Sequence, residues 1–298
     1  MRNLKSMRRT RNIYGWILVL PALISTSVFI FYPVFYSITM SMTDWTGFSF
    51  NNLNFTGIEN YRWLFTEAPH YWESLQVSFK FAIISTIIQT ILGYLLAFVL
   101  YNMTPKAQNF YKTVLYLPVV LPAAVVSVMW GFIYSPEYGL LNQFLRFTGF
   151  DFLTQLWVSD RRFALGSVIA ANTWRYVGIT MILYFVAMCA VPKEVVESAK
   201  IDGANKFKIL SRIFLPLTWE TTQVNLILSL IGGMKSFDLF YLLTGGEAGT
   251  KVVSITIYQT AFVGFRFSKA ITMSIILFII VTLLTLLSHR LTKRKNLD

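Results

Sequence analysis

The chain has 298 residues, of which 55% are hydrophobic and only 13% are charged, and its formal net charge is +12. Soluble domains average about 45–50% apolar and about 25% charged residues, so this composition excludes an ordinary soluble protein and indicates a membrane protein. The single cysteine, Cys189, excludes an internal disulfide. The basic excess would suggest a nucleic-acid partner in a soluble chain, but here its distribution along the chain is more informative.

Six segments are long and apolar enough to cross a bilayer, which needs roughly 20 mostly apolar residues. They are residues 13–42, 78–101, 113–134, 163–190, 217–244 and 267–289. We therefore predict an all-α membrane protein with six transmembrane helices. One transmembrane domain, residues 13–290, then lies between a short N-terminal segment, 1–12, and a C-terminal tail, 291–298.

The first span differs from the others in length and in its prolines. It contains Pro21 and Pro33, so we expect it to be tilted or kinked. Basic residues precede it, as in a signal peptide. However, it is too long for a secretory apolar region and lacks a clear cleavage site, which favours an uncleaved span.

Lysine and arginine predict the orientation of the spans. With both termini inside, the inside segments contain sixteen basic residues and the outside segments contain six. The inside segments are 1–12, 102–112, 191–216 and 289–298. We therefore predict that both termini, and the loop 191–216, lie in the cytoplasm.

The loop 191–216 is a charged segment between the fourth and fifth spans. Pro192 ends the preceding span, and Asp202-Gly203 is a turn signal with helix-compatible residues on both sides. This pattern predicts a helix–turn–helix at the membrane surface, which can insert a short helix into a partner's groove. The alternative is an ordinary basic loop held by anionic lipid headgroups. That alternative explains the lysines but not the spacing of Glu197, Asp202 and Gly203.

The run Glu197–Pro216 resembles the EAA loop of the membrane subunits of ABC importers, with the pattern E-A-A-x-x-D-G-A and a later I-x-L-P. The matching positions are Glu197, Ala199, Asp202, Gly203, Ala204, Ile213, Leu215 and Pro216. Ser198 replaces the second position, and Leu210 stands where the family often has Phe. In that family the loop docks into a groove of the ATPase subunit, so the resemblance implies a permease that does no chemistry itself.

Three further stretches resemble sugar permeases of the maltose-transporter type. They are Phe55–Phe65 with the pattern F-x-G-x-x-N-Y, Tyr116–Pro122, and Gly232–Asp238 followed by Thr244-Gly-Gly246. The alternative for the first is an amphipathic stretch with aromatic side chains at headgroup level. Together these stretches point to the carbohydrate branch of the importers.

The resemblance implies the type I importer permease fold and a set of partners. These are a second, similar permease, two ATPase subunits, an extracytoplasmic sugar-binding protein, membrane lipid and a mono- or oligosaccharide substrate. ATP and Mg are then used by the ATPase, and this chain binds no cofactor. Its location is the cell (inner) membrane of a bacterium or archaeon.

Polar and aromatic residues inside the spans are candidates for the substrate pathway, because polar groups in a bilayer usually face a cavity or a partner. The candidates are Trp130, Asn172, Trp174, Lys235, Phe237, Asp238 and Tyr241. Lys235 and Asp238 lie three residues apart, so on a helix they either pair with each other or meet the substrate. Trp174 and Arg175 equally fit anchors of helix packing.

Other functions find less support in the sequence. Gly245–Lys251 lacks the spacing of a phosphate-binding loop. His70 and His289 lie far apart, so no metal site is expected, and no catalytic constellation supports a membrane-embedded enzyme. The main alternative is an ion- or proton-coupled secondary carrier, which often has carboxylates at mid-membrane; here Asp238 is the one acidic residue clearly inside a span.

Overall fold

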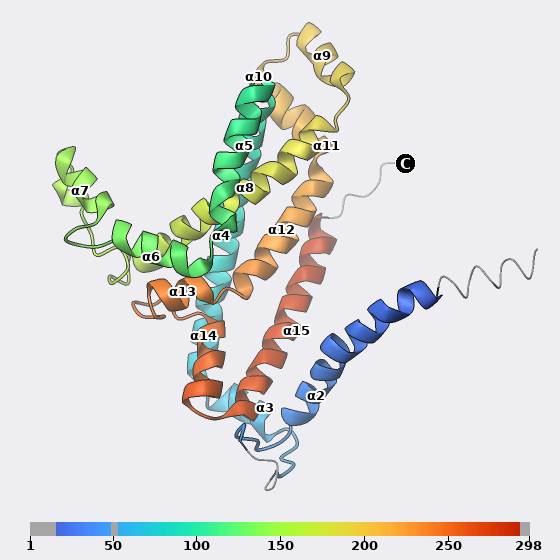
Figure 1. The fold of residues 1–298 in the computed structure, drawn as a ribbon, viewed down its shortest axis with the longest axis vertical. Coiled ribbons are helices and arrows are strands. Elements are labelled where there is room, and N and C mark those ends of the chain that lie inside the picture. Colours follow the sequence, from blue (N-terminus) through green and yellow to red (C-terminus); the bar gives the residue numbers. More distant parts are fainter. Residues whose placement is uncertain (1–15, 49–52, 293–298) are drawn as a thin grey trace, which may run out of the picture. The chain divides into compact units, whose positions relative to one another are not determined.

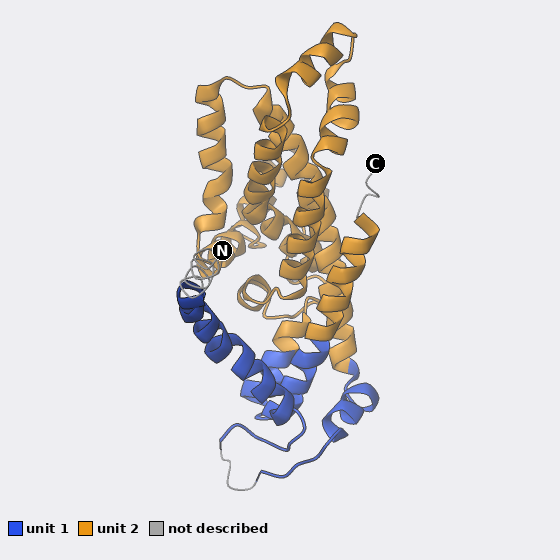
Figure 2. Ribbon diagram, turned by 90° about the vertical axis from the view of Figure 1, so that its right-hand side faces the viewer, with its two compact units in different colours: residues 1–69, 257–277 blue, residues 70–256, 278–298 orange. Residues whose placement is uncertain are grey.

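The structure is a computed structural model that describes residues 16–48 and 53–292, and in this part of the chain the elements are helices joined by turns and loops (Figure 1). The all-α prediction is confirmed. The chain divides into two compact units (Figure 2). Unit 1 comprises residues 1–69 and 257–277, and unit 2 comprises residues 70–256 and 278–298. The segment 1–12 and most of the tail 291–298 lie outside the described residues.

Unit 1 begins with a continuous helix, Trp16–Met40. Its middle is π-helical over η1 (Ser27–Phe31), and α2 (Tyr32–Met40) follows. Proline has no backbone N–H and crowds the preceding turn, so Pro33 accounts for the wider π-helical stretch before it. The other elements of unit 1 are α3 (Glu59–Thr66), η4 (Gln259–Val263) and the start of α15 (Phe267–Thr292).

A buried asparagine closes the end of the first span. The Asn60 side-chain amide donates hydrogen bonds to the carbonyls of Ser41, at 2.8 Å, and Thr43, at 2.7 Å. The Tyr61 hydroxyl lies 2.8 Å from the Ser41 hydroxyl. Gly57 turns the chain into α3 with φ of +61°, a conformation that costs glycine little. The Gly, Asn and Tyr of the F-x-G-x-x-N-Y pattern are therefore a clasp on the backbone that leaves α2.

The start of α15 joins the same clasp. The Ser268 and Thr43 hydroxyls lie 3.0 Å apart, and the Thr272 hydroxyl donates to the Ser41 carbonyl at 3.3 Å. The Lys269 ammonium lies 4.2 Å from the centre of the Trp63 ring, within cation–π range. Hydrogen bonds from three different segments thus hold unit 1 together.

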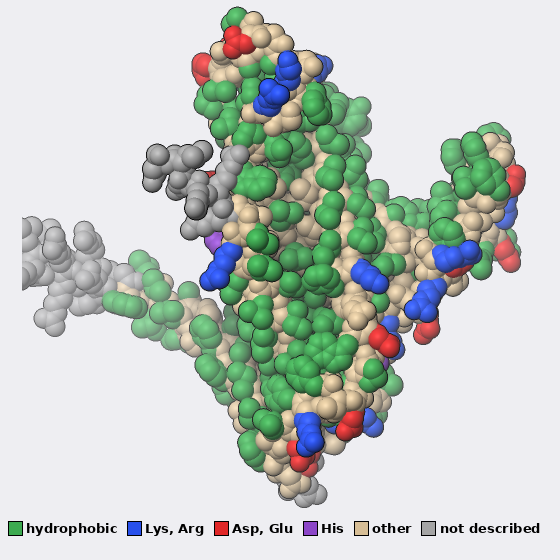
Figure 3. Space-filling view, turned by 180° about the vertical axis from the view of Figure 1, so that it is seen from behind, with side chains coloured by type: hydrophobic (Ala, Val, Ile, Leu, Met, Phe, Trp, Pro, Cys, Tyr) green, Lys and Arg blue, Asp and Glu red, His purple; other side chains and the backbone are tan. Residues whose placement is uncertain are grey.

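Unit 2 is a helical bundle with short connections. Its helices are α4 (Pro69–Tyr101), α5 (Pro105–Val120), α6 (Ala123–Ile133), α7 (Leu140–Phe147), η2 (Asp151–Leu153), α8 (Ala164–Cys189), α9 (Lys193–Ile201), α10 (Lys206–Lys208), η3 (Ile209–Phe214), α11 (Leu215–Leu217), α12 (Trp219–Met234), α13 (Asp238–Leu243) and α14 (Val253–Tyr258). One hydrophobic core packs α4, α6, α8 and α13 together, with Phe81 edge-on to Phe240 at 4.7 Å between ring centres. Hydrophobic side chains also cover the outside of the long helices, and acidic and basic side chains gather at the tip near α9 and α10 (Figure 3).

Within residues 16–48 and 53–292, three helices are long and apolar enough to cross a membrane by themselves. They are Trp16–Met40, Pro69–Tyr101 and Phe267–Thr292, and they correspond to the first, second and sixth predicted spans. Two bent pairs raise the number to five: α5 with α6, bent by 100°, and α8 with α9, bent by 78°.

The predictions for the third and fifth spans need correction. Residues 113–134 are not straight, because the chain is extended at Leu121 and Pro122 between α5 and α6. Residues 217–244 are not one helix, because α12 ends at Met234 and α13 begins at Asp238. Two glycines near the end of α12 lower its helix propensity, and an aspartate favours the first turn of the next helix.

We predict that Asn60→Leu lowers the thermal stability of the full chain in detergent. Leucine has a similar volume but no donor. The Thr43 carbonyl then loses the hydrogen bond from Asn60, and the Ser41 carbonyl keeps only the longer one from Thr272. An unsatisfied buried group costs about 1–3 kcal/mol. The thermal midpoint, followed by loss of monodisperse protein on gel filtration, should fall by several degrees.

Asn54→Leu is the matched control, because Asn54 is exposed and donates to the exposed carboxylate of Asp44. An equal effect of the two variants would remove the special role of Asn60.

Candidate functional site

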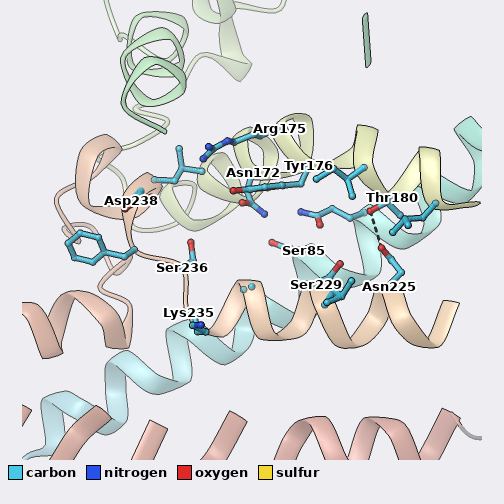
Figure 4. Close-up of a pocket in the computed structure, with 18 residues that line it drawn as sticks. Ser85, Asn172, Arg175, Tyr176, Thr180, Asn225, Ser229, Lys235, Ser236 and Asp238 are labelled. Carbon is cyan, nitrogen blue, oxygen red and sulfur yellow. Dashed lines mark hydrogen bonds between the residues drawn. The ribbon is translucent and has the colours of Figure 1, made fainter. Parts of the chain in front are cut away.

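A cavity of about 450 Å³ lies inside unit 2, between α4, α8, α12 and the chain that links α12 to α13 (Figure 4). Most of the polar side chains in its wall are uncharged. The uncharged polar residues are Ser85, Gln89, Asn172, Tyr176, Thr180, Asn225, Ser229 and Ser236. A cavity of this size, rich in hydroxyl and amide groups, is suited to a small ligand with many hydrogen-bonding groups.

Two of these polar side chains hydrogen-bond to each other, and one has no partner. Thr180 donates to the Asn225 side-chain oxygen at 3.2 Å, and Asn225 donates in turn to the Thr90 hydroxyl at 2.9 Å. The Ser85 hydroxyl is buried and has no hydrogen-bond partner in the described part of the chain. The hydrogen bonds of Asn225 therefore hold α12 to both α8 and α4, whereas Ser85 lies in the wall with an unsatisfied hydroxyl.

Three charged side chains complete the wall: Arg175, Lys235 and Asp238. Lys235 and Asp238 do not share a helix face, because the helix is interrupted between them. Among the described residues, Arg162 and Asp160 form the one ion pair, at 2.7 Å, outside the cavity, where hydrogen bonds from Arg162 lower the pKa of Asp160. The helical pairing of Lys235 with Asp238 is therefore wrong, and Figure 4 shows the two on different sides of the cavity.

Four of the seven candidate residues line the cavity: Asn172, Lys235, Phe237 and Asp238. Trp130, Trp174 and Tyr241 do not belong to its wall. The rings of Trp130 and Trp174 meet edge to face at 5.8 Å between centres, and Tyr241 stacks on Phe237 at 5.0 Å. The Trp174 ring therefore packs on Trp130, and 36% of the residue remains exposed.

The sequence interpretation missed wall residues that carry a recognisable signal. Gln89 and Asn225 are amide side chains in the middle of apolar helices, and both are buried. Polar groups at such positions face the protein interior rather than lipid. Ser85, Thr180 and Ser229 give no such signal, because single hydroxyls are common in membrane helices and can bond to the preceding turn.

The loop 191–216 has the predicted helix–turn–helix form. Helix α9 ends at Ile201, and Gly203 reverses the chain with φ of +79°. Asn205 caps the next helix by accepting a hydrogen bond from the Lys208 backbone N–H at 2.8 Å. An added Cβ at Gly203 would meet no atom within 4 Å, so the backbone conformation, rather than space, requires glycine there.

The tip of this loop presents both charge and apolar surface. Glu197, Asp202 and Gly203 are exposed, whereas Ala199, Ala204 and Pro216 are half-buried. Beside them, 86% of Ile201 and 73% of Phe207 are exposed. Isolated exposed apolar residues need no explanation, but two large ones at a tight turn among charged residues form a suitable contact surface for a protein.

The root of the loop is packed into the bundle. Phe214 is fully buried and packs edge-on against Tyr101 of α4, at 5.0 Å between ring centres. The Tyr94 hydroxyl, also on α4, donates to the Leu210 carbonyl at 2.7 Å. Since α4 carries Gln89 of the cavity wall as well, one rigid helix connects the loop to the cavity.

The model of the family described as binding-protein-dependent transport system inner membrane component matches residues 89–296. The chain belongs to this family. It is 34% identical to the probable ABC transporter permease protein YurN of Bacillus subtilis (strain 168), over 96% of this chain and 98% of that protein. It is 27% identical to AmyD of Thermoanaerobacterium thermosulfurigenes, named as a probable permease of a starch degradation products transport system, over 96% of each chain.

The fold also matches a chain in the crystal structure of a bacterial ABC transporter that imports the acidic polysaccharide alginate. The TM-score is 0.82 at 22% identity, with 99% of this chain and 100% of that chain covered. The predicted importer permease fold is confirmed, and so are the multi-pass membrane location and the prediction of a transport permease rather than an enzyme. Family membership also decides against the secondary carrier.

We predict that Gly203→Val exposes the loop 191–216 to protease. A β-branched residue with φ near +79° is strained, and that strain is released if the turn opens. Trypsin should then cut after Lys200 or Lys206 several times faster than in the wild-type chain.

Gly166→Val is the control, because Gly166 also has no atom near an added Cβ but lies in α8 with ordinary helical backbone. Equal cleavage in both variants would show that the left-handed turn does not protect the loop.

Proposed function

We propose that this chain is a permease subunit of an ATP-driven carbohydrate importer. The observation that carries the proposal is the cavity, whose wall has eight uncharged polar residues and the ring of Phe237. Sugars present hydroxyl groups at their edges and C–H groups on their faces, so hydroxyl, amide and aromatic side chains match them. The name of AmyD, given for starch degradation products, and the alginate importer support the carbohydrate class.

The import cycle that we propose is alternating access in a complex with several partners. Two ATPase subunits bind ATP and Mg and close on them, and the loop 191–216 transmits their motion to α4 and α8 through its packed root. A second, similar permease forms the other half of the pathway, and an extracytoplasmic binding protein delivers the sugar. Residues 1–12, 191–216 and 291–298 then lie in the cytoplasm, which the sixteen-to-six distribution of basic residues supports.

In this proposal the exposed residues of the loop contact the ATPase directly. Ile201 and Phe207 enter an apolar groove, and Glu197 and Asp202 meet polar or basic groups at its rim. Gly203 and Asn205 shape the turn, and Ala199, Ala204 and Pro216 keep the two short helices close to the bundle. The substrate contacts are Asn172, Lys235, Phe237 and Asp238, joined by Ser85 and Gln89.

We predict that Glu197→Lys leaves the chain in the membrane and abolishes sugar-stimulated ATP hydrolysis. The side chain is exposed, so the fold does not depend on it, whereas a reversed charge in an interface costs several kcal/mol. The measurement is co-purification of the ATPase with the chain, followed by ATP hydrolysis in nanodiscs.

Glu220→Lys, an exposed glutamate in the first turn of α12 and outside the loop, is the matched control. Normal co-purification and hydrolysis with Glu197→Lys would refute the docking role.

We predict that Asn172→Leu raises the sugar concentration for half-maximal ATPase stimulation about tenfold, the loss of roughly 1.4 kcal/mol. A panel of neutral and acidic mono- and oligosaccharides, each presented with the binding protein, first identifies the stimulating sugar. The Asn172 amide lines the cavity, and leucine removes the hydrogen bonds that the amide would make to a sugar, with little change in volume.

Asn109→Leu, in an exposed position of α5, should leave that concentration unchanged. If no carbohydrate of the panel stimulates hydrolysis while another solute does, the carbohydrate proposal fails and the permease assignment stands.

A further inference from the structure

The bend between α5 and α6 leaves backbone groups without helical partners. The two helices diverge by 100°, and the chain is extended at Leu121 with φ of −69° and ψ of 135°. Pro122 follows and has no N–H to donate. In a membrane, carbonyls freed by such a break must find another donor, because no bulk water is present.

Arg175 of α8 supplies that donor at the corner. Its Nη2 atom donates to the Leu121 carbonyl at 3.0 Å. Two other contacts hold α8 along the arms of the bend. The backbone at Gly178 approaches the Leu115 carbonyl of α5 so closely that a side chain there would collide with it. The Tyr134 hydroxyl at the end of α6 donates to the Ser167 carbonyl at 3.0 Å.

Of these three contacts, the corner contact is made by a side chain that also lines the cavity. The Arg175 guanidinium lies 5.0 Å from the centre of the Tyr176 ring, another wall residue. Its Nε atom is buried and has no hydrogen-bond partner among the described residues. A guanidinium has five N–H donors in a fixed plane, so rotation toward a new acceptor in the cavity moves the donor that holds Leu121.

We propose that Arg175 is a positioning residue that holds the α5–α6 bend against the cavity wall, so that the bend angle and the shape of the cavity change together. Gly178 and Tyr134 keep the arms close to α8, and Arg175 sets the corner. The proposal concerns the coupling between a wall residue and a helix break, and it does not depend on which solute the cavity takes.

The experiment measures the distance across the bend directly. Cys189, an exposed free thiol, is first replaced by serine so that it takes up no label. Phe110 of α5 and Phe132 of α6, both exposed, are then replaced by cysteine and spin-labelled. Electron–electron double resonance is recorded on the complete transporter complex in nanodiscs, without added sugar. The parent should give one narrow distance distribution, and Arg175→Met should at least double its width or shift its centre by several ångströms.

Two further variants separate positioning from charge and from general destabilisation. Arg175→Lys keeps a long side chain with a donor for the Leu121 carbonyl, so it should restore the parent's main distance. Lys235→Met removes another cation of the cavity wall, one with no side-chain hydrogen bond in the described part of the chain, and should leave the distribution unchanged.

A parent-like distribution in Arg175→Met would overturn the proposal, and so would an equal broadening in Lys235→Met. If the Arg175→Met complex does not assemble, Arg175→Gln is measured in its place. The glutamine side chain is too short to reach the Leu121 carbonyl, whereas lysine can reach it. The proposal then requires a broader distribution for glutamine than for lysine, and identical distributions for the two would refute it.

Discussion

A backbone inside a bilayer has to satisfy its own N–H and C=O groups, and the rest of this structure depends on that constraint. Regular helices satisfy them along their length, so the decisive residues lie where helices end or break. Asn60 serves the carbonyls after α2, and Arg175 serves the carbonyl at the bend between α5 and α6. Outside the long helices, Asn142 has the same role: its side chain joins the Pro136 and Gln155 carbonyls.

The constraint also explains how the cavity and the loop 191–216 can act on each other. The long, unbroken α4 carries Gln89 in the cavity wall and Tyr94 under the loop. A helix resists bending over this short distance, so movement at one residue reaches the other. The helix breaks lie elsewhere, after α5 and after α12, and the residues of the second break, 235–237, belong to the cavity wall. The bundle therefore combines one stiff helix, α4, with two helix breaks. Side-chain contacts determine the geometry of these breaks.

The sequence predicted those features that depend on local pattern. The Asp202-Gly203 turn and the helices beside it follow from residue types whose backbone preferences act within a few residues, and the structure confirms them. Apolar runs gave the approximate position of each span. The break at residues 235–237 escaped prediction because its surroundings are as apolar as an intact span, and hydrophobicity measures burial rather than continuity of the helix.

The cavity was harder to predict than the loop for a related reason. Its wall takes side chains from four helices and one connecting segment, and their meeting depends on packing between residues far apart in sequence. Asn172 and Asp238 were recognisable because polar groups in apolar runs are rare. Trp174 shared that signal but packs on Trp130 instead. An aromatic residue in a membrane span serves packing as well as it serves binding, so its identity does not distinguish the two.

The exposed pair Ile201 and Phe207 has a consequence for the life of the protein before assembly. If the ATPase covers this tip as proposed, a newly made copy that has not yet met its ATPase presents both side chains to water. Such a surface attracts other unfinished proteins, and exposed loop tips are also preferred sites of proteolytic cleavage. We therefore expect unassembled copies to be cleaved before assembled ones. In the proposed complex the docking contact covers Ile201 and Phe207, so synthesis of this subunit together with its ATPase would protect it from cleavage.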